Sequence, residues 1–340
     1  MKGITFGQYH SYATFGLILG SKDIAAPKVK TVTVDVEGAD GVLDLTEYFG
    51  EPKYENRKLS FHFSTMVPQS QFMTLFSTIQ NALHGQKMNI TLDDDLDWYY
   101  TGRIAVPEWK TNKRIGQLTI DCDCEPFKHK LTAQTVSLCG NNLISLDSGT
   151  VSGGGTWVKT GTGYTFTRGS ATGGCFMYWA IPIAKGQQYT FSAAYPLPGC
   201  QSYVYKDRIL GTLVVQASSG NPCIFTAAET GIYIFGLYCI SAATEGTFEN
   251  VMLQTGGVVG SYEAYDATAK EITAIFSNTR KAAVPTAYAV GTIEMQSDSV
   301  SQVLSNGKQL LDSFIFGKGE NPFTFKGNGV AVIEWKEGGL

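Results

Sequence analysis

Short runs in which apolar and polar residues alternate recur along this chain of 340 residues, and they restrict the folds open to it. In RKLSFHFSTM, residues 57–66, the apolar residues Leu59, Phe61 and Phe63 alternate with polar ones, and VKTVTVDVEG at 29–38 does so approximately. A period of two residues is typical of a β-strand with one buried face. The 38 glycines, 17 tyrosines and 19 phenylalanines, with only 16% charged residues, also favour a mainly β fold with many turns.

One segment instead has the periodicity of a helix. In PQSQFMTLFSTIQNALHG, residues 68–85, apolar residues recur at steps of three and four, and Gly85 follows the last of them. Glycine commonly ends a helix at that position because it accepts a left-handed backbone conformation. The sequence therefore predicts one helix here. Strands in KMNITLDD and WYYTGRIAV should follow, joined by an acidic turn at Asp94–Asp97.

Residues from about 138 to 266 contain few Lys and Arg and are rich in Gly, Ser, Thr, Tyr and Trp. Short strand patterns separated by turn residues predict a β-sandwich of the jelly-roll kind in this region. They are GYTFTR, CFMYWAIPI, QQYTFSAAY, SYVYKD, TLVVQA, GIYIFGLYCI and GTFENVMLQTG. After Lys270 the segments AVGTIEMQ, SFIFGKG, PFTFKGNG and VAVIEWKEG predict further hairpin-like strands, with Gly327–Gly329 as the clearest turn.

Charge and hydropathy exclude several classes of protein. The net charge is −4 and the basic residues are spread out, so the electropositive surface of a nucleic-acid-binding protein is absent. No window approaches the roughly 18 apolar residues of a membrane-spanning helix, and polar residues at 10–12 interrupt the N-terminal apolar run. We therefore expect no membrane span and no signal peptide, and seven free cysteine thiols in a chain folded in a cytoplasm.

DCDCEPFKHK, residues 121–130, looks like a metal site but is better explained as the end of a strand. Cys122 and Cys124 continue the apolar parity of the residues before them, and cysteine behaves as a small buried apolar side chain. A zinc site would need ligand pairs about two to four residues apart and a second pair downstream. Only His129 is added here, beyond Pro126 where the strand must end. We expect no metal site.

Catalytic motifs are also missing. LDDDLDWYY, residues 92–100, begins like a calcium-binding loop, but Trp98 and Ile104 occupy the positions of the required glycine and glutamate. None of the common nucleophile or metalloprotease motifs is present, so we expect no enzymatic activity and no cofactor. A glycosidase remains an open alternative, because its two carboxylates can lie far apart in the sequence.

The many aromatic residues of the middle region point to a carbohydrate-binding surface, although aromatic residues in strands also form cores. An exposed ring can stack on the apolar face of a sugar, while neighbouring polar groups hydrogen-bond its hydroxyls. CQSYVYKDR, residues 200–208, combines both features and is the best candidate for a site on a loop. The predicted carbohydrate-binding residues are Trp179, Tyr203, Tyr205, Lys206 and Arg208.

Several segments resemble known proteins. ITFGQYHSYATFGLILGS (4–21), GADGVLDLTEYFGEPKYENRKLSFHF (38–63) and FIFGKGENPFTFKGNGVAVIEWKEGGL (314–340) resemble the distal tail proteins (Dit) of long-tailed bacteriophages. The second is the most specific match, and the third resembles the end of that family's galectin-like domain. NLISLDS (142–148) and GTFENVMLQTGGVVGSYEAYD (246–266) are similar to the first and last strands of carbohydrate-binding modules inserted in phage tail proteins.

The resemblance implies a mainly β protein of three domains. Residues 1–131 would be a tube- and ring-forming β-sandwich with one α-helix and a β-hairpin. Residues 132–138 plus 267–340 would form a discontinuous galectin-like β-sandwich. Residues 139–266 would be an inserted jelly-roll β-sandwich that is similar to a carbohydrate-binding module.

The resemblance also implies a function, that of a structural hub at the tail tip or baseplate. A homohexameric ring would join the tail tube protein to a tail-associated fibre or lysin protein, through head-to-tail contacts. DNA would pass through without specific binding, past acidic residues such as Asp93–Asp97. The chain would be made and assembled in the host cytoplasm, would belong to the virion, and would not insert into a membrane.

The inserted domain would bind a host cell-wall polysaccharide, and several copies around one ring would gain avidity. The alternative is a free, lectin-like carbohydrate-binding protein with no role in a virion. The family-like segments near the N-terminus and the expected lack of a signal peptide argue against it.

Overall fold

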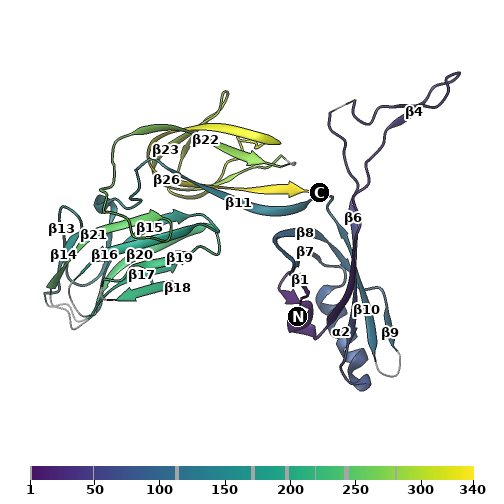
Figure 1. The fold of residues 1–340 in the computed structure, drawn as a ribbon, viewed down its shortest axis with the longest axis horizontal. Coiled ribbons are helices and arrows are strands. Elements are labelled where there is room, and N and C mark those ends of the chain that lie inside the picture. The colour runs from purple at the N-terminus through teal and green to yellow at the C-terminus, as the bar shows by residue number, and fades with distance from the viewer. Residues whose placement is uncertain are drawn as a thin grey trace. The chain divides into compact units, whose positions relative to one another are not determined.

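The computed structural model describes residues 2–48, 50–111, 115–169, 173–195, 199–218, 220–240, 245–279 and 282–340. The chain forms two compact units: unit 1 is residues 1–131 with 337–340, and unit 2 is residues 132–336. Figure 1 shows that both are built mainly from β-strands, as the alternating sequence pattern predicts. The finer division of the chain into three domains stays a prediction.

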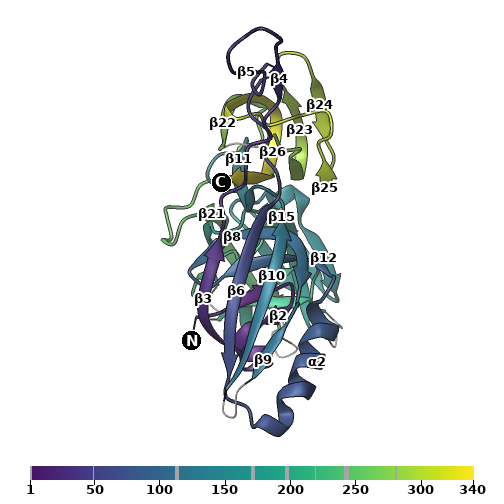
Figure 2. The ribbon, with the colours of Figure 1, turned by 90° about the vertical axis from the view of Figure 1, so that its right-hand side faces the viewer.

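Unit 1 contains antiparallel strands in the order β1–β7–β8–β10–β6–β3 around one apolar core. Figure 2 shows β3, β6 and β10 side by side. The elements are β1 (Ile4–Phe6), β2 (Tyr9–His10), α1 (Ser11–Phe15), β3 (Ile18–Ile24), β4 (Thr33–Asp35), β5 (Val42–Asp44), β6 (Arg57–Thr65), α2 (Phe72–Leu83), β7 (Lys87–Leu92), β8 (Asp95–Ala105), β9 (Trp109–Thr111) and β10 (Gly116–Cys124). β11 (Lys128–Ser137) begins in unit 1 and ends in unit 2.

The strand parity predicted for Cys122 and Cys124 is confirmed. In the β6–β10 ladder Cys122 pairs with Leu59, and both cysteine side chains are buried in the core. Burial raises the pKa of the Cys124 thiol to about 12, so this sulfur is not a thiolate at neutral pH. The neighbouring Asp121 points to the other face, where its carboxylate accepts a 2.6 Å hydrogen bond from Ser60.

The predicted helix is also confirmed. A short 3₁₀ turn at Gln69–Gln71 leads into α2, and Gly85 takes a φ of +76° just beyond its end. Phe72 and Phe76 of α2 contact Trp109 of β9, with ring centroids 5.7 and 5.6 Å apart. The five-residue helix α1 was not predicted.

The predicted strand at 29–38 is mostly wrong. The segment 26–56, called the arm below, leaves the core of unit 1 as a long two-stranded hairpin (Figure 1). Among its described residues, only β4 and β5 form strands, although backbone hydrogen bonds such as Lys30 N to Lys53 O, 2.8 Å, continue the ladder toward the core. The arm has alternating valines but no layer of unit 1 covers them, so neither face is buried.

Most of unit 2 is a β-sandwich of two antiparallel five-stranded sheets around one large core. The first sheet has the order β12–β15–β20–β17–β18 and the second β13–β14–β21–β16–β19. The strands are β12 (Thr150–Gly153), β13 (Thr156–Lys159), β14 (Tyr164–Thr167), β15 (Cys175–Ile183), β16 (Gln188–Ala194), β17 (Cys200–Lys206), β18 (Thr212–Ser218), β19 (Cys223–Thr226), β20 (Gly231–Cys239) and β21 (Glu245–Thr255). All seven predicted strands of this region are present, and β12, β13 and β19 are additional.

The rest of unit 2 is a second antiparallel β-structure with a core of its own. Its main ladder joins the long strand β26 to β22 and β23. The strands are β22 (Lys270–Asn278), β23 (Thr286–Gln296), β24 (Ser301–Leu304), β25 (Gly307–Leu310) and β26 (Gly319–Gly339), of which the last residues of β26 belong to unit 1. The predicted strand SFIFGKG is wrong, because only Phe316 there forms an isolated bridge, with Ala283.

The turn predicted at Gly327–Gly329 is wrong as well. Both glycines have positive φ, 120° and 139°, yet they remain within β26 and stay paired with β23. A Cβ on Gly327 would lie 2.0 Å from the carbonyl oxygen of Thr292. The glycines therefore let two backbones approach closely inside a continuous ladder, a role that glycine also has in strands.

Asn328, between these glycines, links the two parts of unit 2. Its side-chain amide donates to the carbonyl oxygens of Leu138, Asp266 and Thr268 at 3.2, 2.7 and 3.2 Å. Its side-chain oxygen accepts a 2.6 Å hydrogen bond from Tyr265. These hydrogen bonds hold the segment that precedes the β12–β21 sandwich and the segment that follows it side by side against β26.

Candidate functional site

The outer face of the first sheet of the unit 2 sandwich carries a cluster of aromatic rings. Strand alternation puts Cys175, Met177 and Trp179 of β15 into the core, so Phe176 and Tyr178 point outward. The same alternation turns Tyr203 of β17 and Tyr238 of β20 outward, while Tyr205, Ile234 and Gly236 on this face are buried by their neighbours. We call the outward set the aromatic face: Phe176, Tyr178, Tyr203, Tyr205 and Tyr238.

The rings of the aromatic face contact one another across three neighbouring strands. Phe176 and Tyr238 have centroids 4.4 Å apart, and Tyr203 meets Tyr238 edge to face at 5.6 Å. Tyr203 and Tyr205 stack at 5.6 Å with an interplanar angle of 6°. These contacts already restrict the motion of the rings. Stacking a ligand on them would therefore cost the protein little side-chain entropy.

Gly236 of β20 lies at the centre of this face. It is opposite Tyr178 of β15 on one side and Tyr203 of β17 on the other. Gly236 is buried, and a Cβ built on it would make ordinary van der Waals contact, with its nearest neighbours 3.8 Å away. The two tyrosines therefore flank a stretch of β20 that has no side chain between them.

The polar groups of the face are uncharged hydrogen-bonding groups. The Tyr203 hydroxyl donates to the side-chain oxygen of Gln201. Burial, and the neighbouring Tyr205 and Tyr238, raise the pKa of Tyr203 above its ordinary value, so the hydroxyl keeps its proton at neutral pH. At the end of β17, Lys206 forms an ion pair with Glu229, and this hydrogen bond raises the pKa of Lys206.

The structure brings some of the predicted carbohydrate-binding residues together and separates others. Tyr203 and Tyr205 belong to the aromatic face, and Lys206 is the last residue of the same strand, β17. This segment was expected to be a loop. Arg208 is exposed beyond the strand. Trp179 is 2% exposed in the core, and its indole nitrogen donates to the Ser145 carbonyl at 2.9 Å. Carbohydrate binding by these residues stays a prediction, and the burial of Trp179 is an observation against its part in it.

Sequence reasoning did not select Phe176, Tyr178, Gly236 and Tyr238. The information was present in the parity of CFMYWAIPI, because a strand that buries Trp179 must turn Tyr178 to the other face. The partnership of Tyr178 with Tyr203 across Gly236 depends on strand order, which no local pattern reveals.

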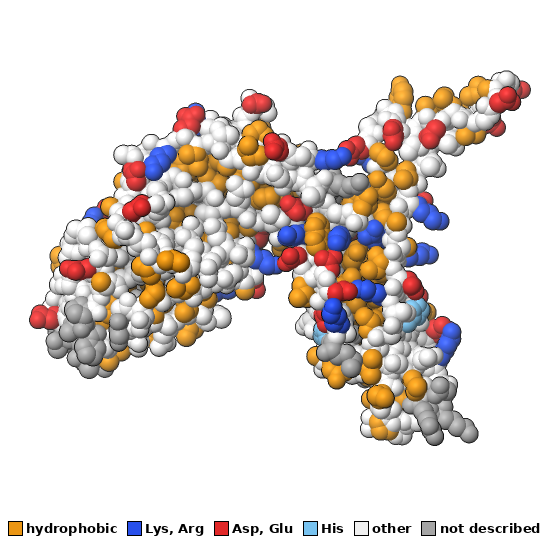
Figure 3. Space-filling model, viewed as in Figure 1, with side chains coloured by type: hydrophobic (Ala, Val, Ile, Leu, Met, Phe, Trp, Pro, Cys, Tyr) orange, Lys and Arg blue, Asp and Glu red, His pale blue; other side chains and the backbone are white. Residues whose placement is uncertain are grey.

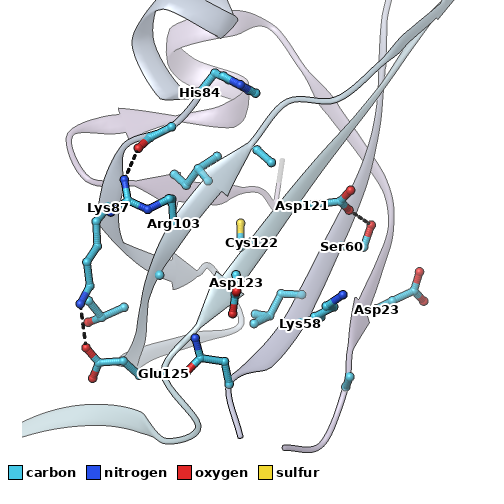
Figure 4. A pocket seen from close by; sticks show the side chains of 18 residues that line it. Asp23, Lys58, Ser60, His84, Lys87, Arg103, Asp121, Cys122, Asp123 and Glu125 are labelled. Carbon is cyan, nitrogen blue, oxygen red and sulfur yellow. Dashed lines mark hydrogen bonds and ion pairs between the residues drawn. The ribbon is translucent and has the colours of Figure 1, made fainter.

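Unit 1 has a separate cavity of about 850 Å³ over β6, β8 and β10, shown in Figure 4. Across these strands Asp123 lies opposite both Lys58 and Arg103. The Arg103 guanidinium donates to the Gly85 carbonyl at 2.6 Å, and the Lys87 ammonium pairs with Glu125 at 3.1 Å. The cavity thus offers a surface of mixed charge.

The cavity shows no activated nucleophile. Burial raises the pKa of the Cys122 thiol far above its ordinary value, so this thiol stays protonated. His84 uses Nδ1 to accept the amide of Val106 at 3.0 Å. In the parts of the chain that the structure describes, no three His, Cys, Asp or Glu residues lie close enough to hold a metal ion. No described helix is long and apolar enough to cross a membrane.

Weak structural likenesses to solved proteins include two phage proteins. No family model matches the chain, and no curated protein matches it. The Dit protein of phage SPP1, described as a hub of the adsorption apparatus of phages that infect Gram-positive bacteria, is similar with a TM-score of 0.39 and 11% identity over 100% of both chains. A chain of the phage P2 baseplate, in its activated conformation with calcium, is similar with a TM-score of 0.32 and 9% identity over 99% of this chain and 98% of that one.

Proposed function

We propose that the chain is a structural hub of a phage tail tip or baseplate. In this proposal it forms a hexameric ring that joins the tail tube to a tail-associated fibre or lysin protein, and it acts without enzymatic chemistry. The resemblance of residues 4–21, 38–63 and 314–340 to distal tail proteins supports this role. Ring closure would use the same pair of surfaces on every copy.

The arm carries the assembly part of the proposal. Its apolar side chains are exposed, with Tyr48 at 73% and Val42 at 61%, and Figure 3 shows the hydrophobic side chains along it. A two-stranded hairpin without a third layer is only marginally stable in water. An ordered hairpin with apolar residues on its surface is therefore best explained by burial against a neighbouring copy of the chain. The exposed apolar residues of the arm are Val29, Val32, Val34, Val36, Val42, Leu43 and Tyr48.

Electron microscopy of the purified full chain tests this role. The proposal predicts particles with six-fold symmetry and a central hole wide enough for a DNA duplex. Uniformly small particles without a hole, in preparations where the chain is folded, would contradict a self-assembled ring. If those small particles bound polysaccharide, the free lectin-like protein would become the better explanation.

We further propose that the β12–β21 sandwich attaches the ring to a saccharide of the host cell wall through the aromatic face. Neutral sugars fit this face, since its polar groups are the tyrosine hydroxyls and Gln201, while Lys206 is already paired with Glu229. Sugar rings have apolar faces that stack on aromatic side chains. Tail-tube and fibre binding, DNA passage and assembly in the host cytoplasm are parts of the same proposal.

Binding of the full chain to purified wall polysaccharides tests the second proposal. Tyr203→Ala and Gly236→Val should each weaken binding by about tenfold or more, the first by removing a ring and the second by placing a branched side chain between Tyr178 and Tyr203. Tyr262→Ala is a matched control, because Tyr262 lies beside Ser192 and Met252 of the other sheet. Equal binding by all three variants would place the sugar elsewhere, and no binding to any wall preparation would remove adhesion from the proposal.

A further inference from the structure

Two cysteines of the unit 2 sandwich face each other across neighbouring strands. Cys200 begins β17 and Cys239 ends β20, and they are directly opposite in the antiparallel ladder. Their sulfur atoms lie 3.2 Å apart, and both side chains are buried, at 2% and 0% exposure. Opposite residues of antiparallel strands have Cα atoms about 4.5–5.5 Å apart, within the range that a disulfide bridges.

A third cysteine is available on the other side of Cys239. Cys175 of β15 is also opposite Cys239 in its ladder. Its sulfur, however, contacts the carbonyl oxygen of Gly173 at 3.9 Å, whereas the sulfur of Cys239 contacts that of Cys200. Cys200 is therefore the partner that the geometry selects.

A buried cation lies beside the pair. The guanidinium of Arg168, 6% exposed, donates to the carbonyl oxygen of Cys239 at 3.2 Å and also to those of Gly173 and Ile240. The hydrogen bond from the Cys239 thiol, with the charge of Arg168, lowers the pKa of Cys200 below its ordinary value. The thiolate is the reactive form of cysteine, so Cys200 is the better nucleophile of the two.

We propose that Cys200 and Cys239 form a redox-active pair that closes into a cross-strand disulfide when the chain meets a small-molecule disulfide such as oxidised glutathione. The Cys200 thiolate attacks one glutathione sulfur, which forms a mixed disulfide and releases one glutathione thiolate. Cys239 then loses its proton and attacks the Cys200 sulfur, releasing the second glutathione. The protein loses two thiols and two protons, and one glutathione disulfide becomes two glutathione thiols.

The bond would join β17 to β20 beneath the aromatic face, since these strands also carry Tyr203 and Tyr238. It would close a covalent loop in the unfolded chain and stabilise the sandwich. The sulfur contact, the strand register and the neighbouring Arg168 support this bond, and none of them depends on assembly or on sugar binding.

Thiol counting on the full chain tests the proposal. The purified protein is incubated with oxidised glutathione, just below its unfolding temperature because the pair is buried, and is then denatured and titrated. The wild type should lose two of its seven thiols, and peptide mapping should find Cys200 joined to Cys239. Oxidation should raise the melting temperature by about 5 °C or more.

Two variants separate the roles of the cysteines. Cys239→Ser should stop at a mixed disulfide between Cys200 and glutathione, while Cys200→Ser should keep all its remaining thiols. Cys223→Ser is the matched control, because Cys223 is equally buried but contacts the Ser202 carbonyl, and it should still form the bond. An unchanged thiol count in the oxidised wild type, or a bond from Cys239 to Cys175, would overturn the proposal.

Discussion

Val34 of β4 lies directly opposite Leu43 of β5, and both side chains are exposed to solvent, by 44% and 52%. Nothing in unit 1 covers this pair among the residues that the structure describes. Exposed apolar side chains make a monomer more prone to aggregate, whereas their burial between two copies stabilises the contact. The pair is therefore a direct place to test the self-assembly proposed above.

We expect Val34→Asp to prevent assembly while the monomer stays folded. A carboxylate at this position would have to lose its hydration at the subunit contact, at a cost of several kcal/mol, about enough to dissociate the ring. Sedimentation velocity and circular dichroism report assembly and folding separately. Val303→Asp is the control, because Val303 is 65% exposed on β24 and outside the arm. If Val34→Asp assembled like the wild type, the arm would not be a subunit contact.

Asp93 should make unit 1 sensitive to acid. Its carboxylate accepts the Gly3 amide at 2.7 Å and His10 Nε2 at 3.1 Å, while His10 Nδ1 caps α1 by accepting two amides. Burial alone would raise the pKa of Asp93, but these hydrogen bonds lower it below its ordinary value. The stabilisation is therefore complete above the unfolded-state pKa of about 3.9 and is lost as the pH falls through the lower folded-state value.

Asp93→Asn should accordingly reduce the free energy of unfolding by about 1 kcal/mol at pH 7, and the difference from the wild type should shrink in strong acid. Urea unfolding at both pH values measures it. Asp97→Asn, at an exposed position of the same acidic run, should change stability by less than about 0.5 kcal/mol. A deficit for Asp93→Asn that stayed constant with pH would show that the carboxylate's charge is not involved.

Gly327→Ala should strongly destabilise the β22–β26 part of unit 2. The added Cβ would lie 2.0 Å from the Thr292 carbonyl oxygen at a φ of +120°, so the β23–β26 ladder must open. We expect a loss of about 2 kcal/mol or more in thermal or urea unfolding. Gly317→Ala provides the control, since its nearest neighbour would be an Asn321 oxygen at 3.8 Å. Near-wild-type stability of Gly327→Ala would disprove the close approach of these strands.

Mutation of Trp179 should mainly reduce stability, whereas mutation of Tyr203 should mainly reduce saccharide binding. Trp179→Ala empties a core position and should cost about 3–5 kcal/mol of unfolding free energy. Tyr203→Ala removes an outward ring and should cost about 1 kcal/mol or less, while it weakens saccharide binding. Chemical unfolding and polysaccharide binding of both variants give the comparison. A Trp179→Ala protein with unchanged stability would contradict its place in the core.

Buried strands could be predicted well from the sequence. The cover of exposed apolar residues and the pairing of distant strands could not. CFMYWAIPI matches β15 residue for residue, because a core strand between turns has a strong pattern. The valines of the arm have the same period as a half-buried strand, but their proposed cover is another molecule, so burial in the monomer could not be inferred from them. GNG has the composition of a turn, and only its pairing with β23 shows that the strand continues.

Light scattering coupled to size exclusion tests the central claim most directly. A closed ring of six chains of 36.8 kDa should elute as one species of about 220 kDa, and Val34→Asp should move it to the mass of a single chain. A wild-type mass of 36.8 kDa that does not change as the protein concentration rises would contradict the assembly of this chain into a hub by itself.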